Sequence, residues 1–281
     1  MLLATLLLVL ASAFLHALWN ALLKKAANIE AASMGILFVS LVVTACAVPF
    51  IPGPAFAEPR ALAWALGAGC CEGLYFLTLC KALESAPLGW SYTWMRGGSV
   101  LLVWPVALLF LGEKLHPASA ASVAALCTGL ALMGLAPRGS AGRGSLGWAA
   151  VVGVSIAGFT LCYKLSLAHG AHPIPLFATS MCVSLPIQIA VRLLRRGYIR
   201  TNFVTTQWAL VLAAGILCTA SFVLYLQALT LAGAGAIATL RNTSVVFAVL
   251  FSWLLGERPT GRQWVGAALV AAGAAGLAWP K

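Results

Sequence analysis

Two arginines lie inside hydrophobic segments of this sequence, at corresponding positions in its two halves. Arg96 begins the run Arg96-Gly97-Gly98-Ser99, and Arg241 begins the run Arg241-Asn242-Thr243-Ser244. A guanidinium within a membrane normally faces a bundle interior or a wet cavity, and its fork of N–H donors suits a carboxylate or a phosphate. We therefore take both arginines as candidate ligand-binding residues. The alternative is a structural role, through an ion pair with Glu72 or hydrogen bonds to the carbonyls of a broken helix.

Glu72 is the acidic residue expected at a similar depth, near the middle of the hydrophobic segment 61–83. A carboxyl group there can carry a coupling proton. It can equally form a permanent ion pair with Arg96 or Arg241. The corresponding residue of the second half is Cys218, so this acid belongs to one half only.

A second group of polar and aromatic residues could line the same site. His16, Trp19 and Asn20 are three and four residues apart, so they share one face of a helix. Interhelical hydrogen bonding and packing are the alternative roles for them. The sequence predicts the following substrate-binding residues: Arg96, Arg241, His16, Trp19, Asn20, Tyr92, Lys164 and Tyr225.

The composition indicates a membrane protein. Hydrophobic residues make up 62% of the 281 and charged residues 8%, with a mean hydropathy of +0.99. The net charge of +11 comes from scattered basic residues that form no continuous groove, which argues against nucleic-acid binding. There is no Asp, no catalytic or nucleotide-binding motif, and no cysteine spacing typical of a zinc or disulfide framework. The sequence thus predicts no enzyme, no metal and no cofactor.

Hydrophobic segments separated by Pro, Gly and charged residues predict ten membrane-spanning helices, each of about 20 residues. Five of them fall before the polar connection 137–145 and five after it. Their expected ranges are 2–23, 32–51, 61–83, 88–112, 117–136, 146–167, 174–194, 207–231, 234–256 and 260–279.

The second half repeats landmarks of the first. The offset is 145 residues between the arginines and 144 between Glu113 and Glu257, each of which follows a glycine. Trp19-Asn20 also matches Tyr163-Lys164 at an offset of 144. Copies of a unit with an odd number of spans insert in opposite senses. We therefore predict two inverted five-helix repeats, residues 1–137 and 146–281, with Glu113 and Glu257 each capping the start of the next helix.

The basic residues predict the orientation. Eleven of the 17 lie at odd-to-even connections, which places those connections in the cytoplasm and both termini outside. The eleven are Lys24, Lys25, Lys81, Arg138, Arg143, Arg192, Arg195, Arg196, Arg200, Arg258 and Arg262.

The sequence resembles the EamA-type transporters of the drug/metabolite transporter superfamily. Three stretches carry the resemblance: Leu15-His16-Ala17-Leu18-Trp19-Asn20-Ala21-Leu22-Leu23-Lys24, Tyr92-Thr93-Trp94-Met95-Arg96-Gly97, and the segment from Leu240-Arg241-Asn242-Thr243-Ser244 through Leu255-Gly256-Glu257-Arg258. The resemblance implies ten helices in two inverted repeats, a central cavity and alternating access. The family is usually described with cytoplasmic termini, whereas the basic residues here predict the reverse.

These observations together predict a multi-pass protein of the cell inner membrane that works as a secondary transporter, with export the expected direction. Its expected partners are a small polar metabolite, anionic or zwitterionic, the lipid bilayer and protons as the coupling ion. The sequence leaves open a monomer or a homodimer. The alternatives are a flippase for a lipid-linked headgroup and, from another class, a membrane sensor or membrane enzyme.

Overall fold

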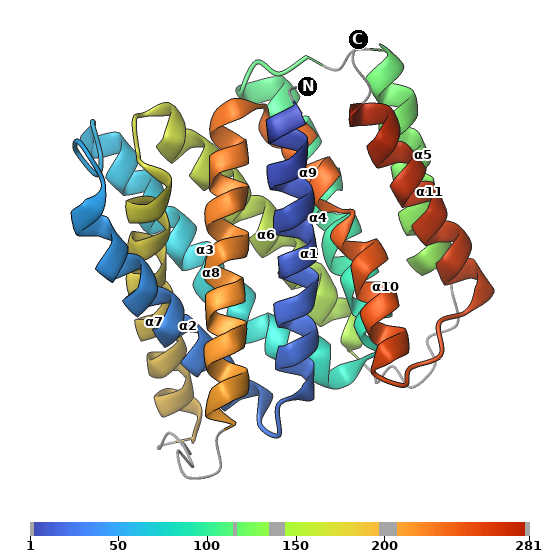
Figure 1. Ribbon diagram of the computed structural model, residues 1–281, viewed down its shortest axis with the longest axis horizontal. Coiled ribbons are helices and arrows are strands. Elements are labelled where there is room, and N and C mark those ends of the chain that lie inside the picture. Colours follow the sequence, from blue (N-terminus) through green and yellow to red (C-terminus); the bar gives the residue numbers. More distant parts are fainter. Residues whose placement is uncertain (1–2, 115–116, 135–143, 197–206, 279–281) are drawn as a thin grey trace.

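Hydrophobic segments bounded by Pro, Gly and charged residues become helices throughout the described chain (Figure 1). The computed structural model describes residues 3–114, 117–134, 144–196 and 207–278. The helices in these ranges are α1 (Leu3–Lys25), α2 (Ile29–Ala47), a short 3-10 helix η1 (Val48–Phe50), α3 (Pro59–Ser85), α4 (Leu88–Phe110), α5 (Pro117–Gly134), α6 (Ser145–Ala168), α7 (Pro173–Arg196), α8 (Trp208–Leu231), α9 (Ala234–Arg241), α10 (Ser244–Leu254) and α11 (Gly261–Ala278).

Eight segments among the described residues are long and apolar enough to cross a membrane. They are α1, α2 with η1, α3, α4, α6, most of α7, α8, and α9 with α10 taken together. The prediction of an all-helical, multi-pass membrane protein is therefore confirmed, whereas ten spans are not. The expected fifth and tenth spans, 117–136 and 260–279, run past the described ends of α5 and α11, and α5 contributes only the shorter apolar stretch Ala120–Gly134.

Several residues used to predict the organisation of the chain lie outside the described part. They are most of the connection between the two halves, 137–143, together with Arg138, Arg143, Arg200 and Lys281. The first residues of α1 and the last of α11 lie at the same end of the bundle, the upper end in Figure 1.

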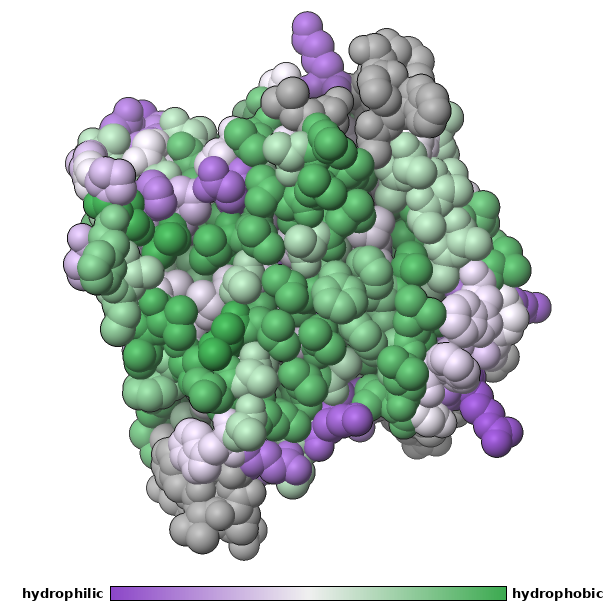
Figure 2. Space-filling view, viewed as in Figure 1, coloured by the Kyte–Doolittle hydropathy of each residue, from purple (hydrophilic) through white to green (hydrophobic). Residues whose placement is uncertain are grey.

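The surface matches a chain that is solvated by lipid. Figure 2 shows hydrophobic residues over most of the visible face, with hydrophilic residues toward its upper and lower edges. Large apolar side chains such as Leu109, Phe110 and Leu194 are more than three-quarters exposed. Such a contiguous apolar surface is expected of a membrane protein, whereas soluble monomers rarely expose one.

Helices from the first half of the chain pack mainly against helices from the second half. α1 packs against α8, α9 and α10, and α6 packs against α3 and α4. α2 packs against α7 and α8, while α5 packs against α11. The two halves are therefore interleaved, so a site between them draws residues from both.

The α5–α11 pair shows how closely the halves approach each other. A Cβ atom added at Gly129 of α5 would lie 2.6 Å from the carbonyl oxygen of Gly266 in α11, and one at Gly273 would lie 2.6 Å from the carbonyl oxygen of Ser122. Glycine is thus required at these positions, because any side chain would separate the two backbones. Small residues at such contacts are typical of helix pairs in membranes.

The segment 234–254 is interrupted at Asn242 and Thr243. Around the interruption the backbone bonds are of the i to i−3 type: Asn242 N–H donates to the carbonyl of Thr239, and Thr243 N–H to that of Leu240, both at 3.0 Å. The Thr243 hydroxyl also donates to the Leu240 carbonyl, at 2.8 Å. Short polar side chains that compete for backbone groups in this way favour local interruption of a helix. The corresponding helix of the first half, α4, is continuous past Arg96-Gly97-Gly98.

Candidate functional site

Arg241 is the last residue of α9, next to the helix interruption, and its side chain lies in the buried core. Only 1% of its surface is exposed. Its guanidinium carbon lies 3.8 Å from the centre of the Tyr225 ring and 4.9 Å from that of Phe222, both in α8. Its Nη2 lies 3.4 Å from the Ser221 hydroxyl oxygen. The aromatic faces attract the cation, so α8 holds the guanidinium in a defined orientation.

His16 connects Arg241 to two further helices. Its Nδ1 lies 3.1 Å from Arg241 Nη2 and 3.3 Å from Trp19 Nε1. Guanidinium and indole N–H groups can only donate, so Nδ1 accepts and a neutral ring carries its proton on Nε2. That nitrogen lies 3.5 Å from the Tyr75 hydroxyl of α3. The imidazole thus fixes one edge of Arg241 relative to α1 and α3.

Arg96 of α4 lies in the same core but is held less firmly. It is 3% exposed, and its guanidinium carbon is 6.0 Å from the centre of the Tyr92 ring. Tyr92 itself donates to the His16 carbonyl at 3.0 Å, so α4 and α1 are tied at this level. The positive charges of Arg96 and Arg241 both act on His16, and they repel each other.

Neither arginine has an acidic partner among the residues that the structure describes: no carboxylate lies within 4 Å of either guanidinium. Arg241 keeps Nε and Nη1 without a hydrogen-bond partner, and Arg96 keeps Nη2. Asn20 Oδ1, both side-chain polar atoms of Asn242 and the Ser244 hydroxyl also lack a partner, as do atoms of five other buried residues: Ser33, Glu72, Trp90, Ser184 and Gln188. Buried polar groups are nearly always hydrogen-bonded, so the unpaired guanidinium N–H groups of the two arginines are available to an acceptor.

Glu72 of α3 is fully buried and is bound by a hydroxyl pair, not by an arginine. The Ser180 hydroxyl of α7 donates to its Oε2 at 2.6 Å, and the Tyr163 hydroxyl of α6 lies 2.9 Å from Ser180 Oγ. The second carboxyl oxygen, Oε1, has no partner. The expected alternative of an ion pair between Glu72 and an arginine is therefore absent from the described contacts.

The remaining candidates divide into two places. Asn20 donates through Nδ2 to the His16 carbonyl at 2.8 Å, so it belongs to the Arg241 group. Tyr225 also belongs there, and its hydroxyl lies 2.8 Å from Thr160 Oγ1 of α6. Lys164, by contrast, donates to the carbonyls of Leu229 and Ala232 at the end of α8, each at 2.8 Å.

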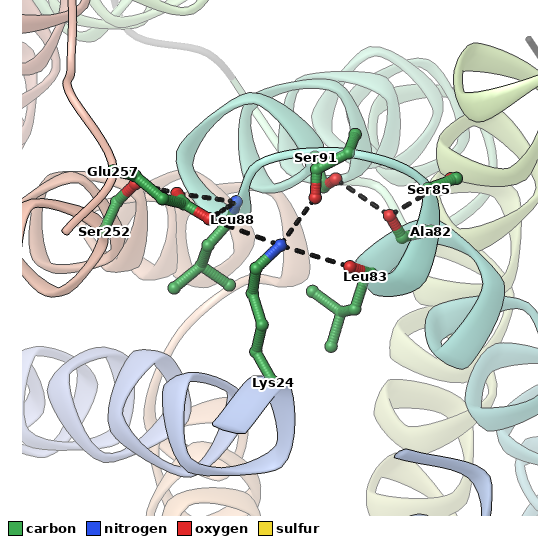
Figure 3. A network of polar contacts seen from close by, with 9 residues as sticks. Lys24, Ala82, Leu83, Ser85, Leu88, Ser91, Ser252 and Glu257 are labelled. Carbon is green, nitrogen blue, oxygen red and sulfur yellow. Dashed lines mark hydrogen bonds and ion pairs between the residues drawn. The ribbon is translucent and has the colours of Figure 1, made fainter. Parts of the chain in front are cut away.

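The capping prediction for Glu113 and Glu257 was right in kind but wrong in the helix that is capped. Glu257 accepts from the backbone N–H of Leu88, the first residue of α4, at 3.0 Å (Figure 3). Glu113 accepts from the N–H groups of Ala234 and Gly235 at the start of α9. Each acid therefore caps a helix of the other half of the chain, because the halves are interleaved.

The contacts also correct the alignment of the two halves in the first helix of each. The sequence pairs Asn20 with Lys164, but the contacts pair Lys24 with Lys164. Lys24 donates to the carbonyls of Leu83 at 3.1 Å and Ala86 at 2.6 Å, at the end of α3, as Lys164 does at the end of α8. A shift of four residues, about one helical turn, keeps the same apolar face buried, so matching letters alone did not define the register.

Two comparisons relate this chain to known proteins. The sequence model of the EamA-like transporter family matches residues 144–279. Through its second half, this chain belongs to the EamA-like transporter family. Membership in this family indicates a transporter. The matched region contains α9, the helix interruption and Arg241. No curated protein matched the sequence.

A likeness in fold to a solved structure covers the first half as well. A solved chain described only as a protein crystal structure is 18% identical to this one, with a TM-score of 0.73 over 97% of this chain and 95% of the solved chain. At that identity the likeness concerns the fold alone. It nevertheless shows that both halves of this EamA-like chain adopt an arrangement seen in a crystal.

Sequence reasoning missed several residues of the site. Ser221, Ser180 and Thr160 contact Arg241, Glu72 and Tyr225, respectively. A lone hydroxyl in a hydrophobic helix resembles many others, and nothing in the sequence marks these three. The run Asn242-Thr243-Ser244 was a usable signal for the helix interruption, since it places three residues that compete for backbone hydrogen bonds in the middle of an apolar segment.

Proposed function

We propose that this chain is a secondary active transporter, working as an exporter, that binds a small anionic or zwitterionic metabolite between the two halves of its helix bundle. One observation carries the proposal: Arg241 and Arg96 are buried in one core without a carboxylate partner among the described residues. A carboxylate or phosphate bound there would accept from the unpaired guanidinium N–H groups. Membership in the EamA-like transporter family supports the transport part.

The electrostatic balance favours an anionic group on the ligand. Two guanidiniums lie in the core, and the acid that interacts with Arg241 there, Glu72, is bound by Ser180. One carboxylate cannot neutralise two cations, and unpaired charges in a region of low dielectric are costly. A ligand that supplies the missing negative charge therefore binds more favourably than a cation of equal size.

The proposal includes the architecture that alternating access requires. Ten spans in two inverted five-helix repeats, 1–137 and 146–281, are supported by the packing, because the pairs α1–α8 and α6–α3 exchange roles between the halves. The Lys24 and Lys164 contacts, and the two glutamate caps, are likewise exchanged between the halves and support the same arrangement. We place the protein in a cell inner membrane with the odd-to-even connections in the cytoplasm, as the basic residues predict. A reporter that is active only in the cytoplasm, fused after Lys281, should be inactive.

The ligand class is tested by a binding screen on the purified protein. We expect carboxylates, phosphates and amino acids to raise its unfolding temperature, because ligands that bind only the folded state stabilise it. Quaternary ammonium compounds of matched size serve as the contrasting set. A protein stabilised by quaternary ammonium compounds, and by none of the anions or zwitterions, would contradict the proposal.

We further propose that Glu72 carries the coupling proton. It is fully buried in the described structure, its Oε1 has no partner, and no arginine is paired with it, so a proton can be gained and lost there without breaking an ion pair. Glu72→Gln should abolish proton-driven accumulation of the identified substrate in proteoliposomes and leave substrate exchange largely intact. Glu84→Gln, at an exposed glutamate of the same helix, is the matched control. Unchanged pH dependence of uptake in Glu72→Gln would make Glu72 structural.

A further inference from the structure

The two glutamate caps belong to two similar clusters, one at each end of the bundle. The Lys24 cluster consists of Lys24, Glu257, the start of α4 at Leu88, and the end of α3 at Leu83 and Ala86. Figure 3 shows Lys24 between the Glu257 carboxylate and the end of α3. The lysine satisfies carbonyls at one helix end, and the glutamate satisfies N–H groups at the start of the next.

The Lys164 cluster repeats this arrangement with the halves exchanged. Lys164 donates to the carbonyls of Leu229 and Ala232 at the end of α8, and Glu113 accepts from Ala234 and Gly235 at the start of α9. α4 and α9 carry Arg96 and Arg241 further along. Each cluster therefore binds the entrance of an arginine-bearing helix to the opposite half of the molecule.

The two clusters are not equally closed. Lys24 Nζ lies 3.3 Å from Glu257 Oε1, and the Ser252 hydroxyl donates to the other carboxyl oxygen. Glu113 and Lys164, both in the described part of the chain, act on each other electrostatically, but no ion pair within 4 Å joins them. The Lys24 cluster thus has one more connection across the halves than the Lys164 cluster.

We propose that the Lys24 cluster and the Lys164 cluster are the two gates of the transporter, one at each end, and that the Lys24 gate is the tighter one in this conformation. The proposal rests on the proposed transport function. Opening one end requires its glutamate to leave the helix start that it caps. At the Lys24 gate, Glu257 leaves the start of α4, so α4 separates from the end of α10. At the Lys164 gate, Glu113 leaves the start of α9, so α9 separates from the segment that follows α4. Since each cap joins different halves, breaking one leaves the other intact.

The gates can be tested without knowing the substrate. Ser221→Cys, beside Arg241, reports access to the core when the eight native cysteines are replaced by Ala or Ser. A membrane-impermeant methanethiosulfonate reagent is applied separately to each side of sealed vesicles. We expect Glu257→Ala to raise the labelling rate from one side, and Glu113→Ala from the other, by about five- to thirtyfold, since losing a helix cap and its cross-half contact shifts the population by about that factor.

The controls separate gating from general loosening. Glu84→Ala removes a glutamate of the Lys81–Glu84 ion pair, at the same end as Glu257 but outside the cluster, and should leave labelling unchanged. If Glu257→Ala fails to fold, Lys24→Met keeps the Glu257 cap and should raise labelling a few-fold from the same side. The gate proposal is overturned if both glutamate variants raise labelling from the same side, or if labelling is unchanged in both. Neither result would affect ligand binding by Arg241, which the binding screen measures separately.

Discussion

Arg96 and Arg241 occupy corresponding positions in the two halves, yet their surroundings differ. Arg241 ends a short helix, lies against two aromatic rings and contacts His16. Arg96 lies within a continuous helix and approaches one ring at 6.0 Å. The segment that carries Arg241 is interrupted directly after it, whereas the helix that carries Arg96 continues past it. We therefore expect Arg241 to bind the ligand directly and Arg96 to contribute charge.

The largest difference should appear when each arginine is truncated. Arg241→Ala should weaken substrate binding by about 1.5 to 3.5 orders of magnitude, since removing one member of a buried charge pair costs about 2 to 5 kcal/mol. Arg96→Ala should weaken it by about one order of magnitude, as expected for a buried charge that acts on the ligand by Coulomb attraction at longer range. Arg60→Ala, at an exposed position, is the control for both. Calorimetric titration measures the substrate affinity of each variant. Equal losses of affinity in Arg241→Ala and Arg96→Ala would contradict the distinction between the halves.

A second comparison replaces the arginine by a lysine. Arg241→Lys keeps the charge and loses the planar fork, so it should recover only part of the affinity lost in Arg241→Ala. Arg96→Lys should recover nearly all of its smaller loss, because a charge without a directed contact needs no fork. Full recovery at position 241, measured in the same titration, would mean that the fork is not used.

Smaller effects are expected from the ring that orients Arg241. Tyr225→Leu removes an aromatic face 3.8 Å from the guanidinium, and a cation–π contact contributes about 0.5 to 2 kcal/mol. Binding should weaken by about two- to thirtyfold. Tyr225→Phe keeps the face and loses the hydrogen bond to Thr160, so it should bind almost as well as the unmodified protein. If both variants lose affinity equally, the hydroxyl and not the ring is responsible.

The smallest effect concerns stability in the absence of ligand. Arg96→Met replaces a buried, poorly paired cation by an apolar side chain of similar length, which is typically neutral or stabilising. We expect the unfolding temperature of the ligand-free protein to stay the same or rise by a few degrees. The increase in unfolding temperature caused by ligand should become smaller. A large destabilisation by Arg96→Met would show that this arginine supports the scaffold.

The sequence was most informative about segments and least informative about partners. Hydrophobic length and the flanking Pro, Gly and charged residues placed the helices within a few residues of their observed ends, because membrane insertion depends on local composition. The interruption after Arg241 was missed as a structural feature, although the polar run that causes it was noted. The tendency of the helix to break is a local property of these polar residues, but the geometry of the break depends on packing against α4 and α8.

The candidate site was predicted only in part, because local spacing shows which residues share a helix face but not which helices meet. His16, Trp19 and Asn20 share a helix face by spacing alone, and the structure brings His16 to Arg241. Lys164 was grouped with them through a register that the contacts do not support. Which helices of the two halves meet is decided by interleaved packing, and no short-range pattern in the chain encodes it.

The exchange of caps between the halves also has a consequence for the order of assembly during synthesis. The start of α4 at Leu88 is capped by Glu257, which follows 169 residues later. At about 5 to 20 residues per second, the ribosome needs about ten to thirty seconds to supply that carboxylate. Until then the first N–H groups of α4 lack their native partner, and α9 is made only after its own cap, Glu113, is already present. The newly made first half therefore waits in an incomplete state, while the second half enters a membrane in which its partner is already formed.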